Sequence, residues 1–186
     1  MIHYQGDMDR LCGVYAVMNA VGAMAGQKLG KERYSALFKV LCDRLMAEGK
    51  LPSVLYGGMS DRTVKKLMES ACQFINAQAG KPGLGFSFPF RGVTLVTSED
   101  FFYRLTQQAS VYGEGSIMLR LLGKYDHWTC VQRITERNIH LLDSIGLQRL
   151  PRHRCATSEG DGLHILVPQE TVFIFHAQGA NTAMKM

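Results

Sequence analysis

The sequence predicts an α+β domain, with helices in the first half of the chain and an antiparallel sheet in the second. Helical spacing of apolar residues recurs up to about residue 110, and from residue 116 short apolar or alternating runs separated by turn residues replace it. With 186 residues, of which 46% are apolar and 20% charged, the chain can form one substantial core and is short for two.

A single domain is therefore expected over residues 1–178, with a helical part over about 1–112 and a sheet part over about 113–178. Residues 179–186 have little to bury and are expected to form a flexible tail.

Four helices are expected in the first part. The first begins near Cys12 and covers residues 14–25, which carry no charge and no proline and are apolar on nearly all sides, as in a buried helix. The other three, with polar caps at Ser60 or Asp61 and at Ser98, are expected over residues 31–48, 61 to about 77, and 98 to about 110.

Two connectors are expected to lack helix. Residues 49–59 contain Pro52 and the pair Gly57-Gly58, which are typical of a loop. Residues 79–92 interleave glycines and two prolines with phenylalanines, so they are expected to be extended. Their alternating part, residues 86–90, predicts a half-buried edge strand or an apolar lip beside a cleft.

The second part of the chain is expected to be mainly sheet. A polar turn at residues 135–138 joins two of the expected strands, so these two should form an antiparallel hairpin. The expected strands are residues 116–122, 128–134, 139–143, 163–167 and 171–175.

Cys12 is the candidate nucleophile, because it stands where the first helix begins. The unpaired backbone N–H groups and the positive end of the dipole at a helix N-terminus favour a thiolate over a thiol. The alternative for Cys12 is a small buried hydrophobic residue.

His127 and Asp143 are the candidate base and its orienting carboxylate. His127 stands at the start of the first hairpin strand and Asp143 at the end of the second, so both lie at one end of the hairpin. A simple register places Asp143 opposite Cys130 and leaves the pair about three residues, or roughly 10 Å, apart along the strands. Strand twist or a bulge must close that gap.

These residues have complementary roles in acyl chemistry. Cys12 would attack a carbonyl, His127 would take and return the proton, and Asp143 would hold the imidazole. The amide of Gln5, together with the backbone N–H of Cys12, would donate to the oxyanion of the tetrahedral intermediate.

With these motifs the sequence resembles the papain-like cysteine peptidase superfamily. Gln5, Cys12-Gly13, His127-Trp128 and Asp143-Ser144 occur in that family's order of oxyanion glutamine, nucleophile, base and orienting residue. The run Cys12-Gly13-Val14-Tyr15-Ala16 and the short length look more like bacteriocin-processing (C39-like) or small bacterial effector peptidases than like papain. The resemblance implies a papain-like fold, in which the nucleophile helix packs on the C-terminal sheet, and a peptide or protein substrate.

The expected reaction is hydrolysis of a peptide or isopeptide bond through a thioester at Cys12. The same triad suits a cysteine acyltransferase or a deamidase, because the acceptor depends on which nucleophile the cleft admits. A further alternative is a binding module without turnover, or a basic protein that docks on nucleic acid. Gly57, Gly58 and Trp128 are candidate substrate-binding residues, and residues 86–90 could also line the cleft. The alternatives are a turn for the two glycines, core for residues 86–90, and a packed or surface position for Trp128.

Composition argues against several other classes. The five cysteines are an odd number at irregular spacing, without a Cys-x-x-Cys pair, so we expect free thiols, no metal site and no cofactor. The chain shows no signal sequence and no apolar run of membrane-spanning length, which predicts a cytoplasmic protein or one delivered to another cell without a cleaved signal.

The net charge of +5 is moderate and its basic residues are scattered, apart from one cluster. That cluster is expected to be a solvated loop rather than a nucleic-acid surface, although an acidic partner could dock there. Its members are Arg149, Arg152, His153 and Arg154.

Overall fold

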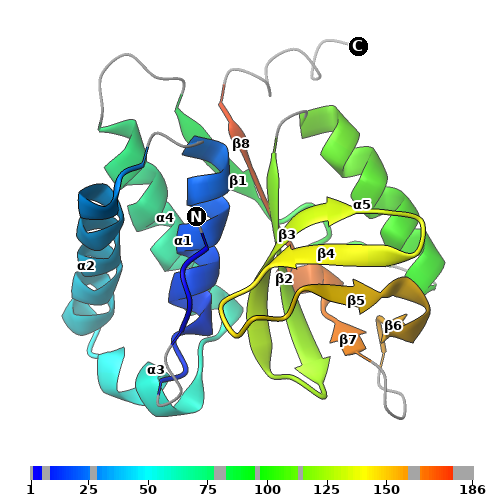
Figure 1. Cartoon of the computed structure of the whole chain (residues 1–186), viewed down its shortest axis with the longest axis horizontal. Coiled ribbons are helices and arrows are strands. Elements are labelled where there is room, and N and C mark those ends of the chain that lie inside the picture. The colour runs from blue at the N-terminus through cyan, green and yellow to red at the C-terminus, as the bar shows by residue number, and fades with distance from the viewer. Residues whose placement is uncertain are drawn as a thin grey trace.

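The fold of the described residues is α+β, as expected. The computed structural model describes residues 2–5, 9–25, 29–77, 83–94, 97–112, 115–158 and 164–177. In this part of the chain there are five α-helices and one sheet of eight strands, which is antiparallel except for one short parallel pair (Figure 1). The expected tail at residues 179–186 lies outside the described residues.

The four predicted helices are confirmed, with ends that differ by a few residues. Ser60 caps the third of them as expected, since its hydroxyl accepts a hydrogen bond from the Thr63 N–H. The cap expected at Ser98 is instead Thr97, whose hydroxyl accepts from the Asp100 N–H at 3.1 Å. The confirmed helices are α1 (Cys12–Ala25), α2 (Lys31–Ala47), α4 (Asp61–Asn76) and α5 (Ser98–Tyr112).

The prediction of a loop over residues 49–59 is wrong, because this segment contains the helix α3 (Leu51–Gly57). Pro52 lies in the first turn of α3, where a missing N–H breaks no hydrogen bond within the helix. Gly58 follows the last turn with φ of +74°, a conformation that glycine adopts without strain. The residues that suggested a loop therefore mark the two ends of a short helix.

The five predicted strands are confirmed over most of their length, and three short strands are additional. The additional strands are β1 (Leu84–Ser87), β5 (Arg149–Pro151) and β6 (Cys155–Ala156), of which β1 fits the edge-strand alternative. The predicted strands are β2 (Ser116–Gly123), β3 (His127–Ile134), β4 (Asn138–Leu142), β7 (His164–Leu166) and β8 (Val172–His176).

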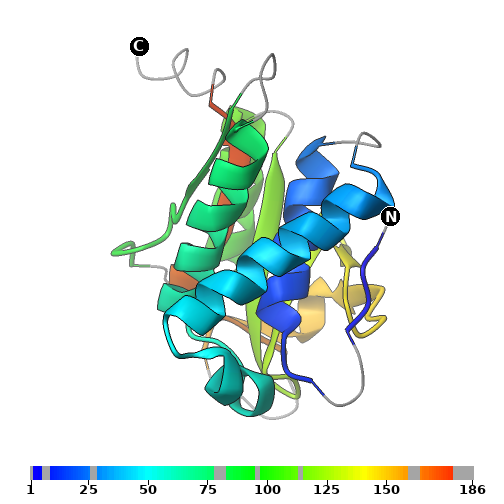
Figure 2. The ribbon, with the colours of Figure 1, turned by 90° about the vertical axis from the view of Figure 1, so that its left-hand side faces the viewer.

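The sheet runs in the order β1-β8-β2-β3-β4-β5, and β7 pairs with β2 and β6 beyond this path. Helix α1 contacts β2, β3 and β8 on one side and α2 and α4 on the other, so it lies between the sheet and the outer helices (Figures 1 and 2). Nearly every residue of α1 up to Gly22 is buried, as its all-round apolar sequence predicted.

A second apolar core forms where α5 packs on the sheet. Alternate residues of β8 show how the sheet divides its side chains: Val172 and Ile174 join the core around α1, and Phe173 joins the core with Phe101 of α5. Apolar residues therefore cover both faces of the central strands, which explains the continuous apolar runs in β2 and β8.

A bulge in β3 sets the register of the β3–β4 hairpin. Arg133 pairs with His140, but Val131 pairs with Leu141, so one extra residue of β3 lies between the two rungs. The extra residue shifts every later pair by one position. Continued past the end of β4, the register places Asp143 opposite Thr129 rather than Cys130.

That one-residue shift also decides which face of the sheet carries Asp143. Paired residues of antiparallel strands project to the same face, and successive residues alternate. His127 and Thr129 share a face with Val131, and Asp143 shares it with Leu141, the partner of Val131. Without the bulge, Asp143 would lie on the opposite face from His127.

The packing of α2 on α1 predicts that Gly22→Ala lowers the free energy of unfolding. A Cβ at Gly22 would overlap the hydroxyl of the buried Tyr34. We expect a loss of about 1–3 kcal/mol from overpacking, although Ala raises helix propensity by about 1 kcal/mol. Urea unfolding measures the change.

The controls for this prediction are a second glycine and a second-site change. Gly57→Ala should not lower the free energy of unfolding, because a Cβ there meets no atom within 4 Å and Gly57 lies in helix α3, where Ala is favoured over Gly. Tyr34→Phe in the Gly22→Ala background should restore part of the loss, since the ring carbon Cζ is the next atom, at 3.0 Å. A Gly22→Ala protein as stable as the wild type would contradict this account of the contact.

Candidate active site

Cys12 is the first residue of α1. The carbonyl of Leu11 accepts hydrogen bonds from the N–H groups of Val14 and Tyr15 at 2.8 and 3.1 Å, so the helix begins at Cys12 as predicted. The Asp9 carboxylate accepts from the Leu11 N–H at 3.0 Å and fixes the chain as it enters the helix. The Cys12 side chain is therefore held at the helix N-terminus, where the dipole favours negative charge.

His127 and Asp143 form a buried hydrogen-bonded pair. His127 Nε2 lies 2.6 Å from Asp143 Oδ2, and the side chains are 5% and 0% exposed. The bulge in β3 shortens the gap along the strands from three residues to two and places both side chains on one face, and the reach of the two side chains closes the rest.

The other neighbour of the His127 imidazole is Cys12. Burial lowers the pKa of His127, but hydrogen bonds and charge interactions with Asp143 and Cys12 outweigh it and raise that pKa to about 9. Because Nε2 is engaged by Asp143, Nδ1 is the ring nitrogen left for the Cys12 sulfur. Cys12 can reach the His127 ring because α1 and β3 begin at the same, lower end of the molecule in Figure 1.

A tight turn after β4 holds the Asp143 carboxylate in place. Asp143 Oδ1 accepts hydrogen bonds from the N–H groups of Ile145 and Leu147 at 2.9 and 3.1 Å. Gly146 between them has φ of +81°, which glycine adopts without strain. Burial raises the pKa of Asp143, but the hydrogen bonds from His127 and Ile145 and the charge of His127 outweigh it and lower that pKa. Asp143 is therefore ionised at neutral pH.

Gln5 lies beside this turn and at the entry to α1. Its backbone N–H donates to the Ser144 carbonyl at 2.9 Å, and its side-chain oxygen accepts from the Ser144 hydroxyl at 3.4 Å. Its amide nitrogen donates to the Asp9 carbonyl. Gln5 thus connects the segment before Cys12 to the turn that holds Asp143.

Asn19 of α1 is a positioning residue that the sequence analysis missed. Its buried side chain accepts a hydrogen bond from the His3 N–H at 2.9 Å, and its amide donates to the carbonyls of His3 and Leu142 at 3.3 and 3.4 Å. One side chain therefore connects α1 to the segment that contains Gln5 and to the end of β4. A lone polar residue inside an otherwise apolar helix was the available signal.

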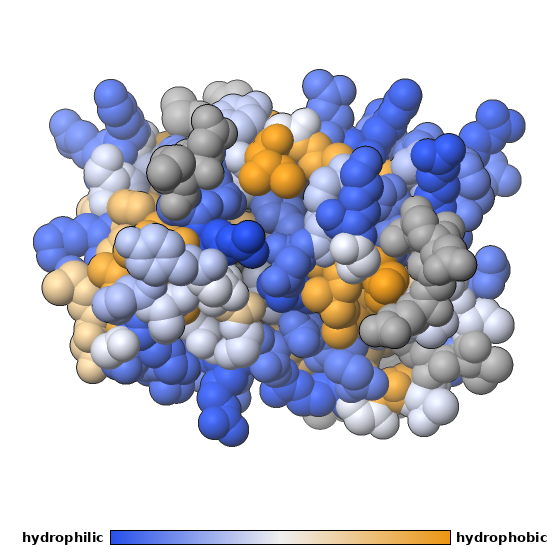
Figure 3. Space-filling view, turned by 90° about the horizontal axis from the view of Figure 1, so that it is seen from below, coloured by the Kyte–Doolittle hydropathy of each residue, from blue (hydrophilic) through white to orange (hydrophobic). Residues whose placement is uncertain are grey.

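Cys12 and His127 open into a cleft of about 330 Å³. Its walls carry charges of both signs together with Tyr125 and the half-exposed Ile145, which sequence reasoning had not singled out. Figure 3 views this end of the molecule and shows hydrophobic patches beside hydrophilic side chains. The described lining residues are Gln5, Asp9, Arg10, Cys12, Gly58, Lys124, Tyr125, Asp126, His127 and Ile145.

The proposed substrate-binding residues divide between cleft and core. Gly58 lines the cleft, whereas Gly57 is exposed at the end of α3 and does not. Trp128 is fully buried in the core around α1, so direct contact between Trp128 and a substrate does not fit the structure. Its indole N–H donates to the carbonyl of Met59 at 3.1 Å and so fixes the backbone next to Gly58.

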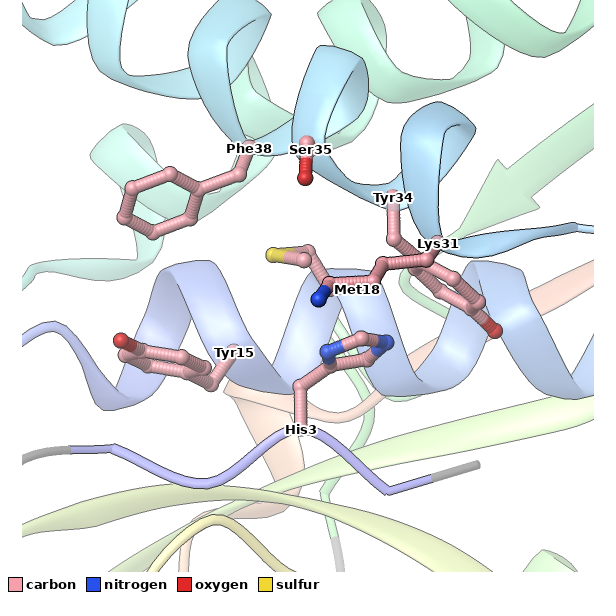
Figure 4. Close-up of a pocket in the computed structure, with 7 residues that line it drawn as sticks. All are labelled: His3, Tyr15, Met18, Lys31, Tyr34, Ser35 and Phe38. Carbon is pink, nitrogen blue, oxygen red and sulfur yellow. The ribbon is translucent and has the colours of Figure 1, made fainter.

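A second cavity, of about 400 Å³, lies between the N-terminal segment, α1 and α2 (Figure 4). Its rings come from the N-terminal segment and from α1 and α2, and the Lys31 side chain extends over Met18. Its described lining carries neither a thiol nor a carboxylate, so this cavity lacks the groups that acyl chemistry needs. The lining residues are His3, Tyr15, Met18, Lys31, Tyr34, Ser35 and Phe38.

All five cysteines are free thiols. Among the described residues no group of three or more His, Cys, Asp or Glu side chains could hold a metal ion, and no helix is both long and apolar enough to cross a membrane. No family model, curated protein or solved structure matches this chain.

The raised pKa of His127 predicts a stability difference that depends on pH. Its folded-state pKa of about 9 exceeds the ordinary 6.5, so the charged imidazole stabilises the fold fully below pH 6.5, and this contribution is lost as pH rises through 9. Asp143→Asn should therefore destabilise the protein at pH 6 by at most about 3 kcal/mol more than at pH 9.5.

Urea unfolding of wild type and Asp143→Asn at both pH values gives this difference, because groups unaffected by the substitution contribute equally to the two proteins. Asp126→Asn is a matched control, since Asp126 is exposed and pairs with Arg120 instead. An Asp143→Asn effect of the same size at both pH values would show that the pair does not govern the His127 charge.

Proposed function

We propose that this protein is a cysteine peptidase or isopeptidase that acts through a thioester at Cys12. The observation that carries the proposal is the position of His127, with Asp143 on Nε2 and the Cys12 sulfur as its other neighbour. The three side chains come from a helix N-terminus, a strand start and a turn; Cys12 and His127 line one cleft, and Asp143 is buried against His127. Nucleophile, base and orienting carboxylate are the groups that acyl transfer needs.

In the first step the Cys12 sulfur attacks the carbonyl carbon of the scissile bond, and the carbonyl π electrons move to oxygen. When the oxyanion collapses, the carbon–nitrogen bond breaks and the leaving amine takes a proton from the His127 imidazolium. Water then attacks the thioester and gives a proton to His127. The second tetrahedral intermediate releases the acid and frees the Cys12 sulfur.

The charged groups of the site suit this sequence. The hydrogen bond and charge interaction with Cys12 are among the causes that raise the His127 pKa, so the two groups are close enough to exchange a proton. Ionised Asp143 stabilises the charged imidazole in turn. An imidazolium that already holds its proton can donate it to the leaving amine.

The papain-like resemblance supports the same assignment. The order of Gln5, Cys12, His127 and Asp143 along the chain is that of the family, and the helix that starts at Cys12 packs on a largely antiparallel sheet. We therefore propose a papain-like arrangement of the domain and a peptide or protein substrate.

Labelling with carbonyl electrophiles tests the proposal. Among peptide-derived and ubiquitin-derived electrophiles, at least one should modify Cys12 at neutral pH, and Cys12→Ala should abolish this modification. His127→Ala should slow labelling by about 10²–10⁴-fold, because the base is lost. Asp143→Ala should cost less, since the imidazole keeps its chemistry. Mass spectrometry of the labelled protein identifies the residue and the rate.

Cys42→Ala is the matched control and should leave labelling unchanged. Cys42 is a half-buried thiol with a pKa raised by burial, and burial raises the pKa of Cys72 and Cys155 to about 11 and that of Cys130 to about 12. Equal labelling of several thiols would refute an activated nucleophile. Products formed with added amine separate hydrolysis from transfer or deamidation.

Gln5→Ala should lower kcat by about 10²–10³-fold with little change in KM, because the oxyanion exists only in the transition state and intermediate. The kinetics are measured on a peptide that the labelling panel identifies as a substrate. Ser144→Ala is the control for the position of Gln5, since it removes only the 3.4 Å bond to the Gln5 side-chain oxygen. An unchanged kcat for Gln5→Ala would exclude Gln5 as an oxyanion donor.

A further inference from the structure

The end of the β3–β4 hairpin opposite the cleft carries a concentration of basic side chains. A groove of about 420 Å³ lies there, between the hairpin turn and β5. The basic cluster expected to be a loop is in fact the strand β5 and the short 3-10 helix η2 (Arg152–Arg154). The described lining is Glu136, Arg137, Asn138, Arg149, Pro151, Arg152 and His153, which gives three arginines and a histidine against one carboxylate.

A row of basic side chains continues from this groove across the sheet. Arg133 of β3 pairs with His140 of β4, and His140 pairs with Arg149 of β5. Directly paired residues project to the same face, so three basic groups stand side by side over about 10 Å. Arg133 and Arg149 therefore lie on one face on either side of His140, where both guanidinium groups can bind the same negatively charged segment.

The guanidinium of Arg152 is pre-organised to bind an anion. It donates to the carbonyls of Thr135 and Glu136 at 3.4 and 3.2 Å, and its Cζ lies 4.4 Å from the centre of the Phe102 ring. These contacts fix the plane of the guanidinium, and its remaining N–H groups can bind a carboxylate. Less side-chain entropy is then lost on binding.

The basic side chains of the groove have no carboxylate partner in the described part of the chain. Every ion pair found there involves other residues, although Glu136 lies in the wall of the groove. The groove therefore offers arginines that form no ion pair with any described carboxylate.

We propose that this groove binds an acidic segment of a protein partner, a short run of Asp and Glu residues. A patch about 10 Å wide matches a few adjacent carboxylates, whereas a nucleic acid would need a longer basic track. The described lining also contains no Phe, Tyr or Trp on which a base could stack.

If the protein is the proposed peptidase, the acidic segment belongs to its substrate. The identification of the partner as substrate rests on the proposed function, whereas the binding of an acidic segment does not. β3 has 8 residues, and its start bears His127 while its end meets the groove. The acidic segment would then bind roughly 25 Å from the bond that Cys12 attacks.

Binding to the full chain carrying Cys12→Ala tests the proposal independently of turnover. The probe is a fluorescent oligo-glutamate peptide, followed by anisotropy. The double variant Arg137→Gln/Arg149→Gln should weaken binding by at least about tenfold, and affinity should fall with added salt. Circular dichroism establishes that each variant is folded.

Arg62→Gln/Lys65→Gln is the matched control, because it removes the same two charges from exposed positions on α4. It should change affinity by less than about twofold. Equal weakening by both double variants, or no binding at low salt, would overturn the proposal. Tighter binding of a single-stranded oligonucleotide through the same arginines would replace it with a nucleic-acid site. Failure of Cys12 labelling with intact peptide binding would overturn the enzymatic function alone.

Discussion

The hydrogen bond between His127 and Asp143 is the contact on which the candidate site depends. It exists because the bulge in β3 places both side chains on one face of the sheet. In the turn after β4, two backbone N–H groups donate hydrogen bonds to the second oxygen of Asp143. A carboxylate held in this way, with both oxygens satisfied, can stay ionised although it is buried. The raised pKa of His127 follows from that charge.

Helix α1 brings the remaining parts to this pair. Its apolar surface packs on the sheet and on the outer helices, while its N-terminus reaches the start of β3. Asn19 fixes the position of α1 along its own axis, because its hydrogen bonds to His3 and Leu142 are directional, whereas apolar contacts are not. Gly13 lets the N-terminal turn of α1 pack closely against Met59, since a Cβ at this position would lie 3.0 Å from the Met59 sulfur.

The two ends of the β3–β4 hairpin differ in chemistry. One end buries a single ion pair beside a thiol, in a cleft with charges of both signs. The other presents arginines that no carboxylate in the described chain neutralises. Because one rigid hairpin carries both ends, a partner that binds the basic end is held at a fixed distance from the cleft.

The sequence by itself determined the α+β class, four helices and five strands, because these follow from local spacing of apolar residues and from caps. It also placed Cys12 at a helix start, and His127 and Asp143 at one end of a hairpin. Only the tertiary structure decided the bulge, the role of Asn19, and the burial of Trp128 away from the cleft. The reason is that each of these depends on contacts between segments far apart in the chain, and no local pattern encodes such contacts.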